Sequence, residues 1–293
     1  MQFIGFLTLC LIWGTTWLAI KFSLDGFPPF FGAAVRFTVA AVAVGLMLLL
    51  KKTSLRISRR DLKILIAASF LMYVFDYGLI YWGEQTLSAG VTAIFFATFA
   101  LFTALWSVLF LKNEQMTPIR WLGIFMGIAG ITVIFYDQLV ITQFNRMVTL
   151  SIIAIILAAA GGSLSNVLVK RHLQKMDAGV ITFYQMSIGI LFLYAIGFAA
   201  EDPSRISLTP KVVAAVGYLA LVGSAFAFVL YYRLLKTMST VTLSLIIYVT
   251  PLIAIFIDYL LYRQIIPLRS MAGMTFIFSG IGLVQKKQSK KRR

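Results

Sequence analysis

The segment GIFMGIAGI, residues 123–131, returns 150 positions later as GMTFIFSGI, residues 273–281, with two glycines and the last isoleucine in the same places. An offset of 149 or 150 relates further identities along the chain: Lys21 and Lys170, Tyr81 and Tyr231, Val91-Thr92 and Val241-Thr242, and Pro118 and Pro267. This period is far longer than that of a solenoid repeat. The sequence therefore predicts two copies of one unit, residues 1–147 and residues 148–293.

Each copy carries five apolar runs of about 18–24 residues, long enough to cross a hydrocarbon core about 30 Å thick. The ten predicted spans are 3–22, 29–50, 62–84, 88–111, 118–136, 148–170, 178–199, 211–235, 239–262 and 268–285. Because each copy crosses the membrane an odd number of times, the second copy enters from the opposite side, as in secondary transporters. We expect an all-α polytopic membrane protein whose ten transmembrane helices form two inverted five-helix repeats.

Composition agrees with this class and argues against others. The chain is 60% hydrophobic and 12% charged, whereas a soluble domain is about 45–50% apolar and about 25% charged. The single cysteine, Cys10, lies within the first span and has no intrachain partner. The sequence contains one histidine, His172, and neither a His-Glu-x-x-His helix nor a Gly-x-Ser-x-Gly elbow. We expect no enzymatic activity, no cofactor and no metal, and the lack of a carbonyl-rich filter argues against a channel.

The net charge of +16 is explained by topology rather than by a nucleic-acid partner, which we do not expect. With a cytoplasmic N-terminus, nineteen of the 26 Lys and Arg residues lie on the inner side, as the positive-inside rule requires. The basic loop 51–63 corresponds to a loop in the second copy that begins Glu201-Asp202-Pro203, so the charge bias is reversed between the copies. The sequence predicts a multi-pass protein of the cell inner membrane with both termini in the cytoplasm. The basic loops and the tail 286–293 are expected to contact the anionic inner leaflet of the lipid bilayer.

Short motifs recur in a fixed order along the first copy: Trp13-Gly14-Thr15-Thr16-Trp17, Lys21, Pro28-Pro29, Arg36, Glu114, Pro118, and Gly123, Gly127 and Gly130. Together with the duplication, this order resembles the EamA-type proteins of the drug/metabolite transporter superfamily over essentially the whole chain. The resemblance implies a ten-helix carrier that moves small metabolites, often outward, by alternating access. Two features depart from the family pattern. Arg263-Gln264 stand where a glutamate is typical, and the proline typical of the fourth span is missing near Leu101, although its partner Pro251 is present.

Charges inside the membrane are the sharpest functional pointers, because each costs about 2.5–3.5 kcal/mol at a bilayer centre. Arg36 and Asp76 lie roughly 10 and 12 Å below the outer ends of their helices at about 1.5 Å per residue, which makes an ion pair between them feasible. Such a pair either fixes helix packing or contacts substrate, with Asp76 binding an amine or a proton and Arg36 binding a carboxylate. Both interpretations remain open.

Aromatic residues supply the other candidate substrate contacts. Trp13 and Trp17 are one turn apart in the first span, and Tyr77 and Tyr81 share a wide face of the third span with Asp76. Tyr248 stands near the proline of the ninth span. An aromatic wall around one polar group suits an amphipathic organic substrate. Packing and an interfacial aromatic belt are the alternative.

Four residues are candidates for gating or coupling: Asp76, Asp258, Glu114 and Pro251. Asp258 lies about 6 Å from the outer end of the ninth span by helical rise. Glu114 suits the positive end of the helix that begins at Pro118. Pro251 leaves one carbonyl without its backbone donor and is expected to kink its helix. Lys21 and Lys170 are matched helix-end residues that fit snorkelling anchors.

The favoured function is secondary transport, with export of small organic metabolites such as amino acids or related amphipathic compounds. The alternative is a lipid or lipid-linked sugar flippase of the same architecture. A proton cycle through Asp76 and an uncoupled exchange are both open, as are a monomer and a homodimer.

Overall fold

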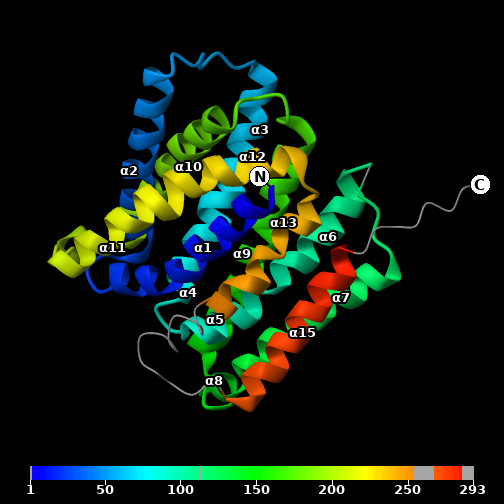
Figure 1. The fold of residues 1–293 in the computed structure, drawn as a ribbon. Helices are drawn as coiled ribbons and strands as arrows, with labels where there is room; N and C mark the ends of the chain where they lie inside the picture. The colour runs from blue at the N-terminus through cyan, green and yellow to red at the C-terminus, as the bar shows by residue number, and fades with distance from the viewer. Residues whose placement is uncertain (1, 113, 254–266, 286–293) are drawn as a thin grey trace, which may run out of the picture.

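Ten helical stretches account for the architecture of the part of the chain that is described, residues 2–112, 114–253 and 267–285 of a computed structural model (Figure 1). Seven of these stretches are long and apolar enough to cross a membrane. The other three are Pro118–Ile134, Thr240–Ile253 and Leu268–Gln285. The fold is therefore the expected all-helical polytopic one. The end of the ninth predicted span and the basic tail lie outside the described residues.

The first half contains five spans and a short surface helix. Its helices are α1 (Gln2–Leu24), α2 (Pro29–Leu50), a third span made of α3 (Arg59–Ser69), η1 (Phe70–Gly78) and α4 (Leu79–Gly83), a fourth made of α5 (Ala89–Phe96) and α6 (Thr98–Phe110), then α7 (Pro118–Ile134) and α8 (Tyr136–Val140). The predicted boundaries agree with these to within a few residues.

The second half repeats this order. Its helices are α9 (Arg146–His172), α10 (Ala178–Ala200), the single-turn η2 (Pro203–Arg205), an eighth span made of α11 (Pro210–Ala220), η3 (Leu221–Phe226) and α12 (Ala227–Thr237), then α13 (Thr240–Ser244), the stretch that continues it to Ile253, and α15 (Leu268–Gln285).

Helix starts follow from local capping chemistry. Side-chain oxygens of six N-cap residues accept hydrogen bonds from the first free backbone amides of their helices: Ser58, Ser88, Asn145, Asp177, Thr209 and Ser239. The start of α2 is capped from the other half of the molecule. There the carboxylate of Glu201 accepts from the amides of Phe30 at 2.8 Å and Phe31 at 2.9 Å.

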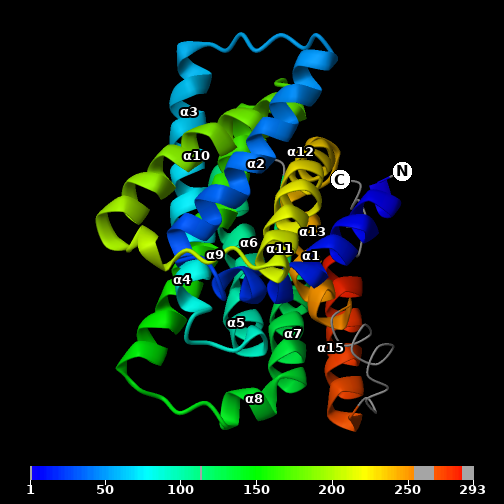
Figure 2. The same ribbon diagram turned by 90° about the vertical axis from the view of Figure 1, so that its left-hand side faces the viewer.

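The two last spans of the halves, α7 and α15, pack antiparallel against each other (Figures 1 and 2). Gly123 meets Gly280, and Gly130 meets Gly273; a Cβ atom on either residue of the first pair would lie 2.5 Å from the partner's carbonyl oxygen. Small residues are what allow helix backbones to approach this closely. Because Gly123 and Gly130 correspond to Gly273 and Gly280 in the repeat, the crossed pairing is that of two copies related by a two-fold axis.

Spans three and eight both contain a π-helical segment, which the sequence did not predict. Residues 221–226 of η3 correspond to 71–76 of η1 at the repeat offset of 150. A π segment widens the helix and leaves its backbone less regularly paired, and such segments are frequent at functional sites. The same local irregularity thus occupies equivalent positions in both halves.

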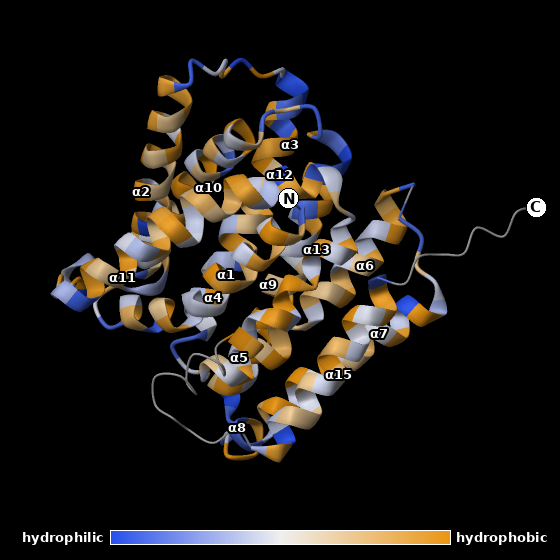
Figure 3. Ribbon diagram, viewed as in Figure 1, coloured by the Kyte–Doolittle hydropathy of each residue, from blue (hydrophilic) through white to orange (hydrophobic). Residues whose placement is uncertain are grey.

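Apolar residues predominate along the helices, and polar residues concentrate in the loops, such as the one between α2 and α3 (Figure 3). Large apolar residues that no protein packing covers include Leu50, Leu191 and Phe198. A surface of this kind requires lipid around it.

Candidate functional site

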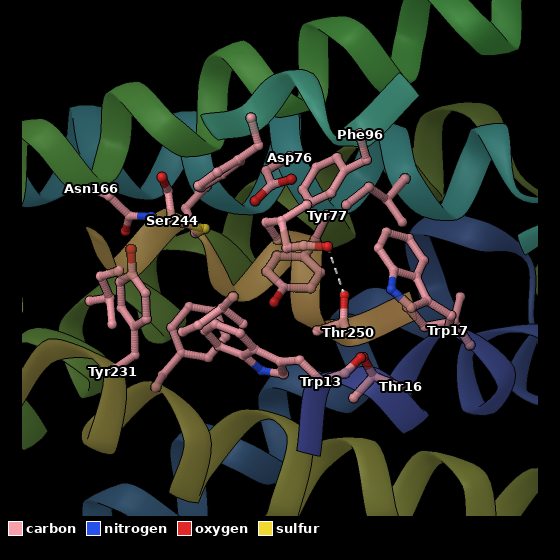
Figure 4. Close-up of a pocket in the computed structure, with 18 residues that line it drawn as sticks. Trp13, Thr16, Trp17, Asp76, Tyr77, Phe96, Asn166, Tyr231, Ser244 and Thr250 are labelled. Atoms are coloured by element: carbon pink, nitrogen blue, oxygen red, sulfur yellow. Dashed lines mark hydrogen bonds between the residues drawn. The ribbon is translucent and has the colours of Figure 1, made fainter. Parts of the chain in front are cut away.

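A cavity of about 80 Å³ lies where the two halves meet (Figure 4). Its walls come from α1, η1, α4, α5 and α6 of the first half and from α9, α12, α13 and the stretch 246–253 of the second. This volume is below the roughly 300–1,000 Å³ of a ligand-binding cleft, so the cavity is narrow in the conformation described. The polar groups that line it are few: Thr16, Asp76, Tyr77, Asn166, Tyr231, Ser244 and Thr250, besides the indole nitrogens of Trp13 and Trp17.

Asp76 is the carboxylate of this cavity. It lies in η1, is 4% exposed, and its Oδ1 atom has no hydrogen-bond partner among the described residues. Its side chain lies against Gly162 of α9, where a Cβ atom would stand 2.6 Å from the carboxyl carbon. A buried carboxylate oxygen without a partner is costly, so Oδ1 is an open acceptor in the wall of the cavity.

Aromatic rings surround the carboxylate. Trp13 contacts Tyr231 with ring centroids 5.3 Å apart and Phe228 with centroids 5.9 Å apart. On the other side of the cavity Trp17 packs edge-on against Phe96 at 5.5 Å. Rings around a negative group form an environment that attracts organic cations through both charge and cation–π contacts.

The hydroxyl groups of the cavity are already used as donors. Those of Thr16, Ser244 and Thr250 donate to the carbonyls of Trp13, Val241 and Ile247 at 2.8, 2.8 and 3.1 Å, the last seen as a dashed line in Figure 4. Their oxygens remain available as acceptors. Ile247 is the carbonyl that Pro251 deprives of its backbone donor, and the hydroxyl of Thr250 replaces that donor.

Asn166 is a cavity residue that the sequence reasoning missed. It is buried on α9, and its Oδ1 atom has no partner among the described residues. In Figure 4 its side chain lies near Ser244 and Tyr231, at the opposite end of the cavity from Trp17. The available signal was an amide next to two serines, Ser163 and Ser165, within an otherwise apolar span.

Arg36 does not form the ion pair with Asp76 that the sequence made feasible. It is 1% exposed; its Nε donates to Ser224 Oγ at 2.8 Å, and its terminal nitrogens lie 3.5 Å from Tyr81 Oη and from the Gly223 carbonyl. The π segment η3 offers the acceptors on Ser224 and Gly223. The ring of Tyr77, which lines the cavity, covers the guanidinium with 4.9 Å between its centroid and Cζ.

The candidate residues thus fall into two groups. Trp13, Trp17, Asp76 and Tyr77 line the cavity, whereas Arg36 and Tyr81 lie behind it. Tyr248 also lies elsewhere: its hydroxyl donates to the Ile124 carbonyl at 3.0 Å, and its ring packs on Gly127.

The gating candidates are dispersed. Pro251 borders a second cavity, lined also by Trp17 and Lys21, which is the outer cavity in the orientation proposed below. We expected Glu114 to interact with the start of the helix that begins at Pro118. Instead, its carboxylate accepts a hydrogen bond from the Thr240 amide at 2.7 Å and so caps α13. The chain reverses between α6 and α7, which turns Glu114 toward the second half. Asp258 lies outside the described residues.

Two related halves around a buried, aromatic, singly acidic cavity define a polytopic membrane protein of the carrier class. The chain belongs to the EamA-like transporter family, whose model matches residues 2–136 and 149–285. Each match covers one of the two repeats.

Several known proteins are similar in sequence to most of this chain. The uncharacterized transporter YoaV of Bacillus subtilis is 24% identical, with 95% of this chain and 94% of that protein covered. Protein PagO of Salmonella typhimurium is 26% identical over 95% and 90% of the two chains. The uncharacterized inner membrane transporter YedA of Escherichia coli K12 is 28% identical over 84% and 78%. A solved crystal structure shares the fold with a TM-score of 0.81 at 17% identity, covering 96% of this chain and 95% of its own.

Proposed function

We propose that this transporter exports small organic metabolites that carry an amine, such as amino acids and related amphipathic compounds, across the inner membrane by alternating access. The observation that carries the proposal is the Asp76 carboxylate, buried, with one oxygen unpartnered, in an aromatic cavity shared by two related halves. A substrate ammonium group would supply the missing donor, and the rings would hold an apolar side chain. The acceptor oxygens of Thr16, Ser244 and Thr250 offer further places along the cavity wall for donors of such a substrate.

The proposed roles of the other candidates follow from their positions. Trp13, Trp17 and Tyr77 contact the substrate. Arg36 and Tyr81 hold Tyr77 from behind, and Tyr248 fixes its helix against α7. Substrate and proton compete for the same carboxylate, so outward movement of the amine is coupled to inward movement of a proton.

Orientation follows from charge. We propose that both termini face the cytoplasm, because this orientation places nineteen of the 26 Lys and Arg residues on the inner side, six of them in residues 51–63 and six in the tail 286–293. In this orientation α1 ends at the outer face, and α9, its repeat counterpart, ends at the inner face.

Counterflow into proteoliposomes, measured over a panel of amino acids, nucleobases and cationic drugs, tests the proposal. We expect amine-bearing compounds to exchange and Asp76→Asn to reduce exchange at least about tenfold, a loss of about 1.4 kcal/mol in transition-state stabilisation. Asp25→Asn is the matched control, because Asp25 is exposed and paired with Lys211 at 2.8 Å outside the cavity. Full exchange by Asp76→Asn, or exchange of neutral nucleobases alone, would contradict the proposed substrate class.

A further inference from the structure

Two lysines at equivalent repeat positions tie each half together in the same way. Lys21, near the end of α1, donates to the carbonyl of Glu84 and, at 2.6 Å, to that of Leu87. Lys170, near the end of α9, donates to the carbonyls of Leu235 at 2.6 Å and Met238 at 3.0 Å. Each lysine therefore bridges the end of the first span of its half to the connection between the third and fourth spans, α4–α5 in the first half and α12–α13 in the second. In an inverted repeat these bridges lie on opposite faces of the membrane.

The Lys21 bridge borders the route from the central cavity to the outer face. Lys21 and Trp17 both line the outer cavity, and Trp17 also lines the central one. Ser88 and Ala89, at the start of α5, line the outer cavity as well. Movement of the α4–α5 loop away from α1 would widen this route.

Glu84 places a carboxyl group at this bridge. Its side chain is 0% exposed, and neither Oε1 nor Oε2 has a hydrogen-bond partner among the described residues. Glu84 directly follows the span that ends at Gly83. Burial raises the pKa of its carboxyl from 4.5 to about 8, although Lys21 acts in the opposite direction.

Among the described residues, Lys21 is the charged group that acts on Glu84. Lys21 of α1 faces it, while α9 presents Ser151 and Ile155 to the adjoining Gly83. The Nζ of Lys21 is engaged with backbone carbonyls, and no ion pair with Glu84 is found within the described parts of the chain. A neutral carboxyl tolerates this arrangement; an ionised one would draw the ammonium group to itself.

The second half lacks this carboxyl. At the offset that relates Tyr81 to Tyr231, Glu84 corresponds to Leu234. The acid nearest to Lys170 is Glu114, which already accepts from the amides of Thr240 and Val241. Both bridges therefore use the same lysine-to-carbonyl hydrogen bonds. They differ in the carboxyl group beside them, which has no hydrogen-bond partner among the described residues at Glu84 and is used for capping at Glu114.

We infer that Glu84 is the proton-responsive residue of the outer gate. When its carboxyl group loses its proton, the ammonium group of Lys21 moves from the backbone carbonyls to this carboxylate, and the α4–α5 loop is no longer held to α1. This inference rests on the proposed alternating-access function but not on the identity of the substrate. It assigns the proton-dependent opening of the outer gate to Glu84 and substrate binding to Asp76.

Cysteine labelling in nanodiscs tests the gate without substrate and without regard to orientation. The parent variant combines Cys10→Ala with Ala93→Cys, because Ala93 is buried and lines the outer cavity. A water-soluble maleimide is applied between pH 6 and pH 9. Each rate is divided by that of the same cysteine in a Glu84→Gln background at the same pH, which removes the titration of the thiol itself.

We expect this ratio to be close to one at pH 6 and to rise at least about fivefold across pH 8. Glu84→Leu, which copies the second half, should label as slowly as Glu84→Gln, and Lys21→Met should label fast at every pH. Asp25→Asn is the control acid on the same face and should follow the parent. A ratio that stays at one throughout, or slow labelling of a monodisperse Lys21→Met variant, would overturn the inference. If the ratio rises with pH as expected but amine-bearing compounds show no counterflow, the result counts against the substrate proposal alone.

Discussion

Asp76 lies directly against the backbone of Gly162, so that the absence of a side chain on α9 is what gives the carboxylate its place in the cavity. A methyl group at Gly162 would stand 2.6 Å from the carboxyl carbon, closer than real packing allows. The neighbouring Gly161 has the same relation to Phe75, where the added Cβ would lie 2.7 Å from the ring-bearing Cβ. The pair of glycines therefore sets how closely α9 approaches η1.

Gly162→Ala should displace the Asp76 carboxylate and lower counterflow at least about tenfold, with an overpacking cost of about 1–3 kcal/mol. Gly217→Ala is the matched control, since nothing lies within 4 Å of a Cβ atom at that helical position. The measurement is counterflow at equal amounts of reconstituted protein. Unchanged transport in Gly162→Ala would show that the carboxylate does not need its present position.

The glycine contact between α7 and α15 predicts a stability effect separate from transport. In Gly130→Ala the new methyl group would lie 2.7 Å from the Gly273 carbonyl oxygen, and we expect about 1–3 kcal/mol of destabilisation. Thermal unfolding in detergent is the readout. Gly282→Ala has open space around it and should leave the melting temperature unchanged or raise it, because alanine favours helix by about 1 kcal/mol over glycine. Equal melting of the two variants would contradict the proposed close packing.

Arg36 is expected to act through Ser224 as a structural unit. Ser224→Ala removes the acceptor of a buried charged donor, which costs about 1–3 kcal/mol. Arg36→Gln removes the donor, and the double variant should cost clearly less than the two single changes together. A double-mutant cycle of unfolding free energies measures this coupling. Strict additivity would mean that the 2.8 Å contact contributes nothing.

Glu114 provides a test of gating against capping. Because its carboxylate accepts from the first amides of α13, Glu114→Ala should lower stability by about 0.5–2 kcal/mol. Glu114→Gln retains one acceptor oxygen and should keep most of both stability and transport. If Glu114→Gln is as stable as the parent but does not transport, the residue takes part in gating beyond its cap.

The architecture was predictable because repetition and hydropathy determine it. The identities between residues 123–131 and 273–281 indicated two copies, and the structure pairs these same glycines across the two-fold axis. The boundaries of α2, Pro29–Leu50, were predicted to the residue, because a proline starts the helix and the apolar run ends at two lysines. The π segments were not predictable, since a helix of either kind has the same apolar pattern.

The cavity was predictable only in part. An acid among aromatics within one span indicated Asp76 and Tyr77, and both line the cavity. Arg36 was placed near Asp76 by depth alone, but rotation about the helix axis and the acceptors of η3 decide its contacts. Asn166 left only the weak signal of its neighbouring serines, and Glu84 could not be selected without the fold, because its surroundings form only when α1 and α9 pack against it.

The account centres on one cavity that opens to each side of the membrane in turn, and access to Ser244 tests this most directly. Ser244 is buried, lines the cavity, and comes from the second half. A Cys10→Ala, Ser244→Cys variant is exposed to an impermeant thiol reagent in right-side-out and in inside-out vesicles, with and without a transported amine. The account predicts labelling from both sides and slower labelling when the amine is present. Labelling from one side only, unaffected by the amine, would contradict it.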